Sequence, residues 1–186
     1  MLTCSLYRLE GRPGRHCIYV GVLQHSRLNP LPVDPVEKVR HHVDAIFGPE
    51  VSKALPKDMQ FEFSRKTGRI KNFSIDGRLA ATLRTDGGLA LTISGAQFLL
   101  DNSKEFKENC IAPVQEAVPF VTEGRSLFCR HVQWSGANVH AGSDVAVTNG
   151  ASVIAVGIAV MGHALMGRYR RGVAVKVREG LKSRAP

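Results

Sequence analysis

The last third of the chain shows the clearest alternation of apolar and polar positions. Residues 173–178 read Val-Ala-Val-Lys-Val-Arg, which predicts a strand with one inward and one outward face. Two apolar runs precede it, 144–148 and 153–160, and Asn149-Gly150 joins them. Both turn residues tolerate positive φ, so this dipeptide favours a tight hairpin. We therefore expect three strands of a small barrel, with 162–172 as a Gly-bounded loop that contains one helical turn.

One amphipathic helix is predicted near residue 40. Asp34-Pro35 is a favourable start, because aspartate caps the first turn and proline suits the first helical position. Gly48-Pro49 would end the helix. Apolar side chains recur at helical spacing between these signals: Val36, Val39, Val43 and Phe47.

Residues 59–94 predict a meander of short strands. Thr-Gly, Asp-Gly and Asp-Gly-Gly separate its apolar runs, and all three are turn signals. Ser94 is placed to cap a helix that runs to Leu100. The charged segment 101–108 then resembles a linker, with cleavage by proteases expected near 103–108 or within 30–35.

The pattern therefore predicts an α+β protein of two domains. Residues 1–108 would form an N-terminal α/β domain and residues 109–186 a mostly β domain. In the second, we expect a short helix at 118–121 that stops at Gly124, followed by a strand over 126–132.

The charge of the chain is concentrated near its end. The 186 residues carry a net charge of +9, and residues 168–184 hold seven Lys or Arg against one acid. A folded β platform with a cationic rim favours a polyanionic partner, most often nucleic acid. A solvated basic tail without a partner is the alternative.

No apolar stretch reaches the length of a membrane span, and the N-terminus lacks the apolar core of a signal peptide. We therefore expect a cytoplasmic protein with no membrane contact.

The cysteines offer no metal site by their spacing. Cys4, Cys17, Cys110 and Cys129 form no C-x-x-C pair, so we expect no metal and favour buried free thiols, while two disulfides stay open as an alternative. We find no phosphate-binding, dinucleotide-binding or hydrolase motif and expect no cofactor. Cys129 and His131 are spaced to share a strand face, but nothing marks a third orienting group. We therefore predict a protein without catalytic activity.

Two stretches resemble known families. EAVPFVTEGRSLFCRHV, AGSDVAVTNGASVIAVGIAVM and RRGVAVKVREG are together similar to the PUA domain, the RNA-binding module named for pseudouridine synthases and archaeosine transglycosylases. The upstream SRKTGRIKNFSIDGRLAATLRTDGGLALTISGAQFLL resembles the small domain that precedes PUA in archaeal tRNA-guanine transglycosylases and other proteins of the archaeosine pathway. The resemblance covers about residues 59–180. Those relatives carry a catalytic barrel for which this chain has no room, so no catalytic residue is carried over.

The resemblance implies an N-terminal domain of the pre-PUA type and a C-terminal mixed-strand pseudo-barrel that grips RNA along the helix–strand turn and the last strand. The chain departs from the family between Met161 and Arg171, where GHALMGRYRR (162–171) stands in place of an acidic helix and adds positive charge. Phe128 could instead be a core aromatic, and Gly124 could be no more than a helix stop. With the basic loop added, the predicted RNA-binding residues are Gly124, Arg125, Ser126, Phe128, Arg130, Arg168, Arg170, Arg171, Lys176 and Arg178.

Two functions follow from these observations. The first is non-catalytic binding of tRNA or rRNA in RNA modification, ribosome assembly or translation. The second is a protein-interaction adaptor that docks on an RNA-modification enzyme or a pre-ribosome. An adaptor would expose an apolar patch on residues 17–47, whereas RNA binding requires Arg125 and Arg130 to be continuous with the cluster 168–176.

Overall fold

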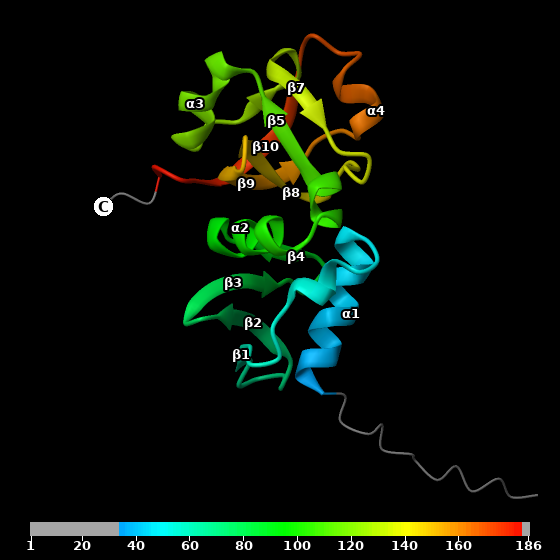
Figure 1. Cartoon of the computed structure of the whole chain (residues 1–186), viewed down its shortest axis with the longest axis vertical. Helices are drawn as coiled ribbons and strands as arrows, with labels where there is room; N and C mark the ends of the chain where they lie inside the picture. Colours follow the sequence, from blue (N-terminus) through cyan, green and yellow to red (C-terminus); the bar gives the residue numbers. More distant parts are fainter. Residues whose placement is uncertain (1–33, 184–186) are drawn as a thin grey trace, which may run out of the picture. The chain divides into compact units, whose positions relative to one another are not determined.

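The structure, a computed structural model, describes residues 34–183, which fold around two β-sheets (Figure 1). Helix α1 (Pro35–Phe47) begins where the sequence predicts. The Asp34 side chain accepts a hydrogen bond from the Val36 backbone N–H at 3.1 Å, and Pro35 occupies the first turn. Val39, Val43 and Phe47 are buried, so the predicted apolar face is the packed face.

The first sheet is the predicted meander. Its strands are β1 (Gln60–Phe63), β2 (Ile70–Ile75), β3 (Arg78–Leu83) and β4 (Leu89–Leu91), paired antiparallel in chain order. Helix α2 (Ile93–Asn102) follows β4 directly. The prediction that Ser94 caps α2 is wrong, because Thr92 does so. Its hydroxyl accepts from the Gly95 N–H at 3.1 Å and donates to the Leu79 carbonyl at 2.6 Å, so one side chain binds both the helix and β3.

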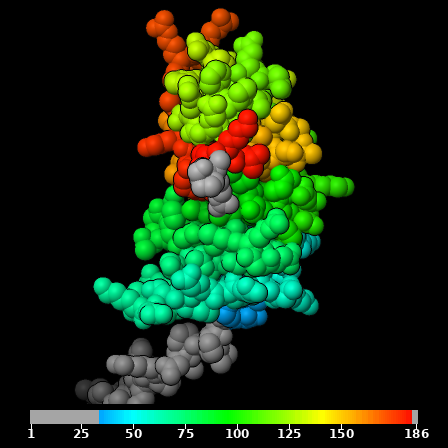
Figure 2. Space-filling view, turned by 90° about the vertical axis from the view of Figure 1, so that its left-hand side faces the viewer, coloured from blue at the N-terminus to red at the C-terminus, as the bar shows by residue number. Residues whose placement is uncertain are grey.

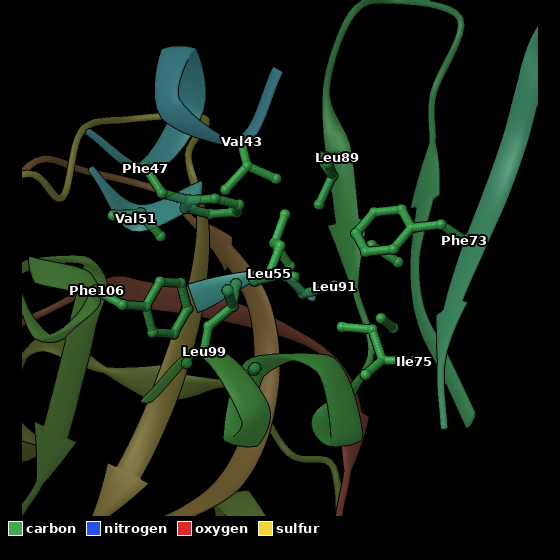
Figure 3. Close-up of a cluster of buried hydrophobic side chains, with 14 of the residues drawn as sticks. Val43, Phe47, Val51, Leu55, Phe73, Ile75, Leu89, Leu91, Leu99 and Phe106 are labelled. Atoms are coloured by element: carbon green, nitrogen blue, oxygen red, sulfur yellow. The ribbon is translucent and has the colours of Figure 1, made fainter. Parts of the chain in front are cut away.

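Aromatic side chains from distant parts of the chain meet in the first core (Figure 3). Phe47 and Phe106 pack edge to face with ring centroids 5.4 Å apart, and Phe73 on β2 belongs to the same core. The segment 101–108, which the sequence predicted to be a charged linker, is largely helical in the structure. It holds the end of α2 and the 3-10 helix η2 (Glu105–Asn109), and Phe106 within it is completely buried.

The second sheet has six short strands in the order β6-β10-β9-β8-β5-β7. β5 and β8 are parallel and the other pairs are antiparallel, so this is the mixed, barrel-like sheet that the sequence predicts. The strands are β5 (Cys110–Pro113), β6 (Leu127–Phe128), β7 (Val132–Ser135), β8 (Asp144–Asn149), β9 (Ser152–Ala159) and β10 (Val173–Gly180). Separate helices and sheets make the fold α+β.

The continuous strand expected at 126–132 is interrupted. β6 ends at Phe128, the 3-10 helix η4 (Cys129–His131) turns the chain, and β7 begins at Val132. Backbone hydrogen bonds fix this turn, since the Cys129 N–H donates to the Gly172 carbonyl and the Val114 N–H to the His131 carbonyl.

The remaining helices are short. They are η1 (Val51–Ala54), η3 (Gln115–Ala117), α3 (Val118–Thr122) and α4 (His163–Met166), and α4 is the predicted helical turn before β10.

The two sheets are joined through α2 and β9. The first core contains Ala146, Val153 and Val156 of the barrel. The Gln97 side chain on α2 accepts from the Val153 N–H at 2.7 Å and donates to the Ala151 carbonyl at 3.0 Å. The division of the chain into two domains that meet at residue 108 remains a prediction.

The described part of the chain adds three observations on the predicted chemistry. Cys110 and Cys129 are buried free thiols, while Cys4 and Cys17 lie outside the described residues. Within residues 34–183, His, Cys, Asp and Glu side chains form no group of three suited to a metal ion, and no helix there is long and apolar enough to cross a bilayer.

Candidate RNA-binding surface

The turn between α3 and β6 is shaped by a glycine in a left-handed conformation. Gly124 has φ +94°, a value that glycine adopts without steric cost. Its N–H donates to the Val121 carbonyl at 2.9 Å, and the Arg125 N–H donates to Phe120 at 3.0 Å. These bonds end the helix as predicted and turn the backbone toward β6. The same glycine leaves this part of the turn free of a side chain.

The end of β10 lies directly against this turn. A Cβ on Gly180 would stand 2.5 Å from the Gly124 nitrogen and 2.6 Å from the Thr122 carbonyl oxygen, which is closer than atoms can pack. The Lys182 N–H donates to that same carbonyl at 2.9 Å. Sequence reasoning missed Gly180. The available signal was a glycine that ends an alternating strand, a position where another backbone often approaches closely.

Arg125 projects from the turn over an exposed aromatic ring. Its guanidinium carbon lies 5.4 Å from the Phe120 ring centroid, and Phe120 is 52% exposed. Glu123 lies 3.7 Å from the Arg125 Nε, but both side chains are more than half exposed, so this ion pair is weak. The arginine and the ring therefore present a cation and a flat apolar face to solvent.

Phe128 lies outside the core. It is 47% exposed on β6, so it is not the buried core aromatic that the sequence left open. Its cross-strand neighbour is Val173 on β10, while Leu127 pairs with Val175 and is buried. Arg130 is exposed two residues further, where its Nε donates to the His131 Nε2 at 2.9 Å. Ser126, at the start of this segment, is half-buried.

The basic segment that follows α4 joins this region through the β6–β10 pairing. Met166 is buried and anchors α4, whereas Arg168, Arg170 and Arg171 are exposed. The Gly172 carbonyl, one residue later, accepts from the Cys129 N–H at 3.0 Å. Figure 2 shows the orange-red side chains of this part of the chain projecting beside the yellow-green α3–β6 region. Lys176 on β10 is also exposed.

Arg178 has a different environment from the other predicted residues. Its Nη1 lies 2.6 Å from the Asp144 Oδ1, and its Nη2 donates to the Leu91 carbonyl at 2.7 Å. Only about a third of the side chain is exposed. Because the Arg178 charge is already paired with the buried Asp144 carboxylate, we leave Arg178 out of the proposed surface.

Sequence reasoning also missed exposed residues that could contact a polyanion. The β1–β2 turn presents Arg65, Lys66 and Arg69, next to Phe63, which is 47% exposed. Tyr169, within the basic segment, is 54% exposed. The signal for the first group was three basic residues close together at a predicted turn.

The one cysteine–histidine pair that the sequence brought forward is not arranged for nucleophilic catalysis. Burial raises the pKa of the Cys129 thiol, which disfavours the reactive thiolate at neutral pH. The His131 Nε2 is occupied by the Arg130 side chain. What the surface offers is exposed donors and aromatic faces, a combination suited to binding phosphates and bases.

The fold and this surface define the class of protein. Residues 114–181 match the PUA domain family, and residues 37–105 match the patch-forming domain C2 of tRNA-guanine transglycosylase. The chain therefore carries a PUA domain preceded by a domain similar to the transglycosylase C2 domain, as the resemblance predicted.

Related proteins of known sequence are archaeal tRNA-guanine(15) transglycosylases. That of Thermoplasma volcanium is 33% identical over 147 residues, and that of Methanothermobacter thermautotrophicus is 28% identical over 150 residues. The matches cover 78% and 80% of this chain but 23% of each relative. The chain thus spans about a quarter of the length of these relatives, and the match comprises their C-terminal domains without the catalytic barrel.

Solved structures share the fold at low sequence identity. A hypothetical protein of Pyrococcus horikoshii OT3 superposes with a TM-score of 0.64 at 21% identity, covering 80% of this chain and 91% of its own. A PUA domain protein of Aeropyrum pernix K1 gives 0.57 at 15% identity, covering 78% and 80%. Both confirm the predicted fold class.

Proposed function

We propose that this chain binds tRNA or rRNA without catalysing a reaction, and that it acts in the cytoplasm in RNA modification, ribosome assembly or translation. One observation carries the proposal. β6 pairs with β10 through Phe128 and Val173, and the Cys129 N–H donates to the Gly172 carbonyl, so the end of the α3–β6 turn and the end of the basic segment are neighbours, which supports a continuous binding surface. The sequence had set this continuity as the requirement for RNA binding.

The chemistry of the surface suits an RNA. Exposed arginines make charge-assisted bonds to phosphates and stack on bases. Gly124 lets a phosphate or base come close to the backbone because no Cβ intervenes. Phe120 and Phe128 offer exposed rings to unpaired bases. The proposed contacts are Gly124, Arg125, Ser126, Phe128, Arg130, Arg168, Arg170, Arg171 and Lys176.

The comparisons support tRNA as one candidate RNA. The relatives are named for modification of a guanine in tRNA, and they share with this chain the C2 and PUA domains rather than the catalytic barrel. We infer from this that the chain contributes RNA binding, and that a modification enzyme or a ribosome-assembly protein would act with it.

The adaptor hypothesis receives less support from the described residues. It required an apolar patch on residues 17–47, and residues 17–33 lie outside the described structure. From residue 34 onward, Val39, Val43 and Phe47 face the protein's own core. The apolar face of α1 is therefore already occupied.

The proposal is tested by removing the cationic segment and measuring binding of labelled tRNA by fluorescence anisotropy. The variant Arg168→Ala/Arg170→Ala/Arg171→Ala should bind at least tenfold more weakly. Each phosphate contact releases counterions from the RNA, and this favourable release is lost with the contact. Lys38→Ala/Lys53→Ala/Lys57→Ala is the matched control, since it lowers the net charge equally on exposed residues of the other half. Equal affinities for the two triple variants, both folded, would contradict the proposal.

A further inference from the structure

Trp134 lies beside an open groove at the far edge of the barrel-like sheet. It is on β7, the last strand in the sheet order, and its cross-strand neighbour is Ala112 on β5. The groove has a volume of about 770 Å³ between the end of α2, η2 and the β8–β9 turn. Its aromatic and polar lining includes Asp101, Lys107, Gln133, Trp134 and Thr148.

Packing does not account for this tryptophan. Trp134 is 37% exposed and belongs to neither of the two buried cores, although tryptophan side chains are mostly buried. The Lys107 ammonium stands 5.8 Å from the indole centroid. An accessible indole with a cation at its ring is therefore part of the groove wall.

We propose that this groove binds one unpaired nucleotide of an RNA, with its base stacked on the Trp134 indole and its phosphate held by Lys107. The inference rests on the proposed RNA-binding function and adds a second contact to it. None of the residues of the α3–β6 turn or of segment 168–176 lines the groove, so it is distinct from the surface around Phe128. The site would select single-stranded over duplex RNA.

The lining favours a nucleotide over a peptide. Stacking needs a flat partner, and every base supplies one whatever the sequence. The Asp101 carboxylate, the Gln133 amide and the Thr148 hydroxyl offer acceptors and donors to the edge of a base. Lys107 supplies the positive charge that a phosphate requires, in a chain whose net charge is +9.

Tryptophan fluorescence reports on this site alone, because Trp134 is the only tryptophan in the sequence. Titration with a short single-stranded oligoadenylate should quench the tryptophan emission, with the same midpoint as binding measured by anisotropy of labelled oligoadenylate. A blunt-ended RNA duplex should bind through the cationic surface and leave the emission nearly unchanged.

Three variants separate stacking from general apolar contact and from charge. Trp134→Leu should weaken oligoadenylate binding roughly tenfold, as the loss of one base–aromatic stack does, whereas Trp134→Phe should retain most of the affinity. Lys107→Met keeps the length of the side chain and should weaken binding while flattening its salt dependence. Thermal melts of all three establish that the chain is folded.

The outcomes are distinct. RNA binding with unchanged emission, or equal affinity of Trp134→Leu and wild type, overturns the groove site and leaves the proposed function standing. If wild type binds neither tRNA nor oligoadenylate by anisotropy, the proposed function fails and the groove site fails with it.

Discussion

The Asp144 carboxylate and the Arg178 guanidinium lie 2.6 Å apart, on two strands that flank β9. The Asp144 side chain is 3% exposed, and the Arg84 guanidinium approaches its second oxygen at 3.7 Å. Arg178 also donates to the Leu91 carbonyl on β4. One buried carboxylate thus gathers two arginines and connects the barrel to the meander sheet.

Arg178→Ala should lower the free energy of unfolding by about 3 kcal/mol, because it leaves the buried Asp144 without its main partner. Urea unfolding measures the change. Lys176→Ala, an exposed position on the same strand, is the control and should change stability by less than about 0.5 kcal/mol. A loss of stability in Arg178→Ala that is no larger than the loss in Lys176→Ala would contradict a structural role for Arg178.

Gly180→Ala should destabilise the protein by about 2 kcal/mol, because the added methyl group displaces the backbone of the α3–β6 turn. RNA affinity should fall with it, as the turn is part of the proposed surface. Gly167→Ala is the matched control, since a Cβ there meets no atom within 4 Å. Thermal melts and tRNA titrations of both variants check this, and unchanged binding by folded Gly180→Ala would remove the turn from the surface.

Arg125 and Arg130 should determine which RNA is preferred rather than overall affinity. If one of them makes a paired contact to a base, its replacement by Ala should reduce discrimination among competing RNA ends by about 1–3 kcal/mol. The triple change at Arg168, Arg170 and Arg171 should weaken all RNAs alike, because phosphate contacts carry no sequence information. Competition titrations with RNAs that differ at the 3′ end separate the two effects, and uniform loss in the Arg125 and Arg130 variants would place these side chains on phosphates.

Cys110 should make stability fall at alkaline pH. Burial raises the pKa of its thiol from 9.0 to about 12. Below pH 9 the thiol is neutral in both states, so it contributes no pH dependence. Between pH 9 and about 12 it ionises in the unfolded chain but not in the folded one, so unfolding becomes more favourable. Comparing unfolding of wild type and Cys110→Ala from pH 8 upward isolates this contribution. A pH dependence that is identical in the two proteins would exclude it.

Phe106→Ala should destabilise both halves of the described chain together, by about 3–5 kcal/mol. The Phe106 ring packs on Phe47 within a core that also contains barrel residues. Trp134 fluorescence and far-ultraviolet circular dichroism should therefore give coincident unfolding transitions, and segment 103–108 should resist proteases. Two separate transitions, or early cleavage at 103–108, would instead support two domains that meet at residue 108.

The sequence by itself determined the elements whose signals are local. Asp34-Pro35 and Gly48 define α1 because capping and left-handed backbone depend on a few neighbouring residues. Turn dipeptides separate the strands of the meander and the β8–β9 hairpin for the same reason. The order and type of residues within the PUA and C2 stretches also specify the fold class.

Tertiary structure decided how each residue is used. Thr92 rather than Ser94 caps α2 because its hydroxyl also meets β3, and Phe106 is core because α1 lies beside it. Arg178 and Lys176 are two residues apart on one strand, yet only Arg178 meets a buried carboxylate. The roles of Gly180 and Trp134 depend on neighbours that are distant in sequence. Such environments arise from long-range packing, which a pattern of residue types along the chain does not contain.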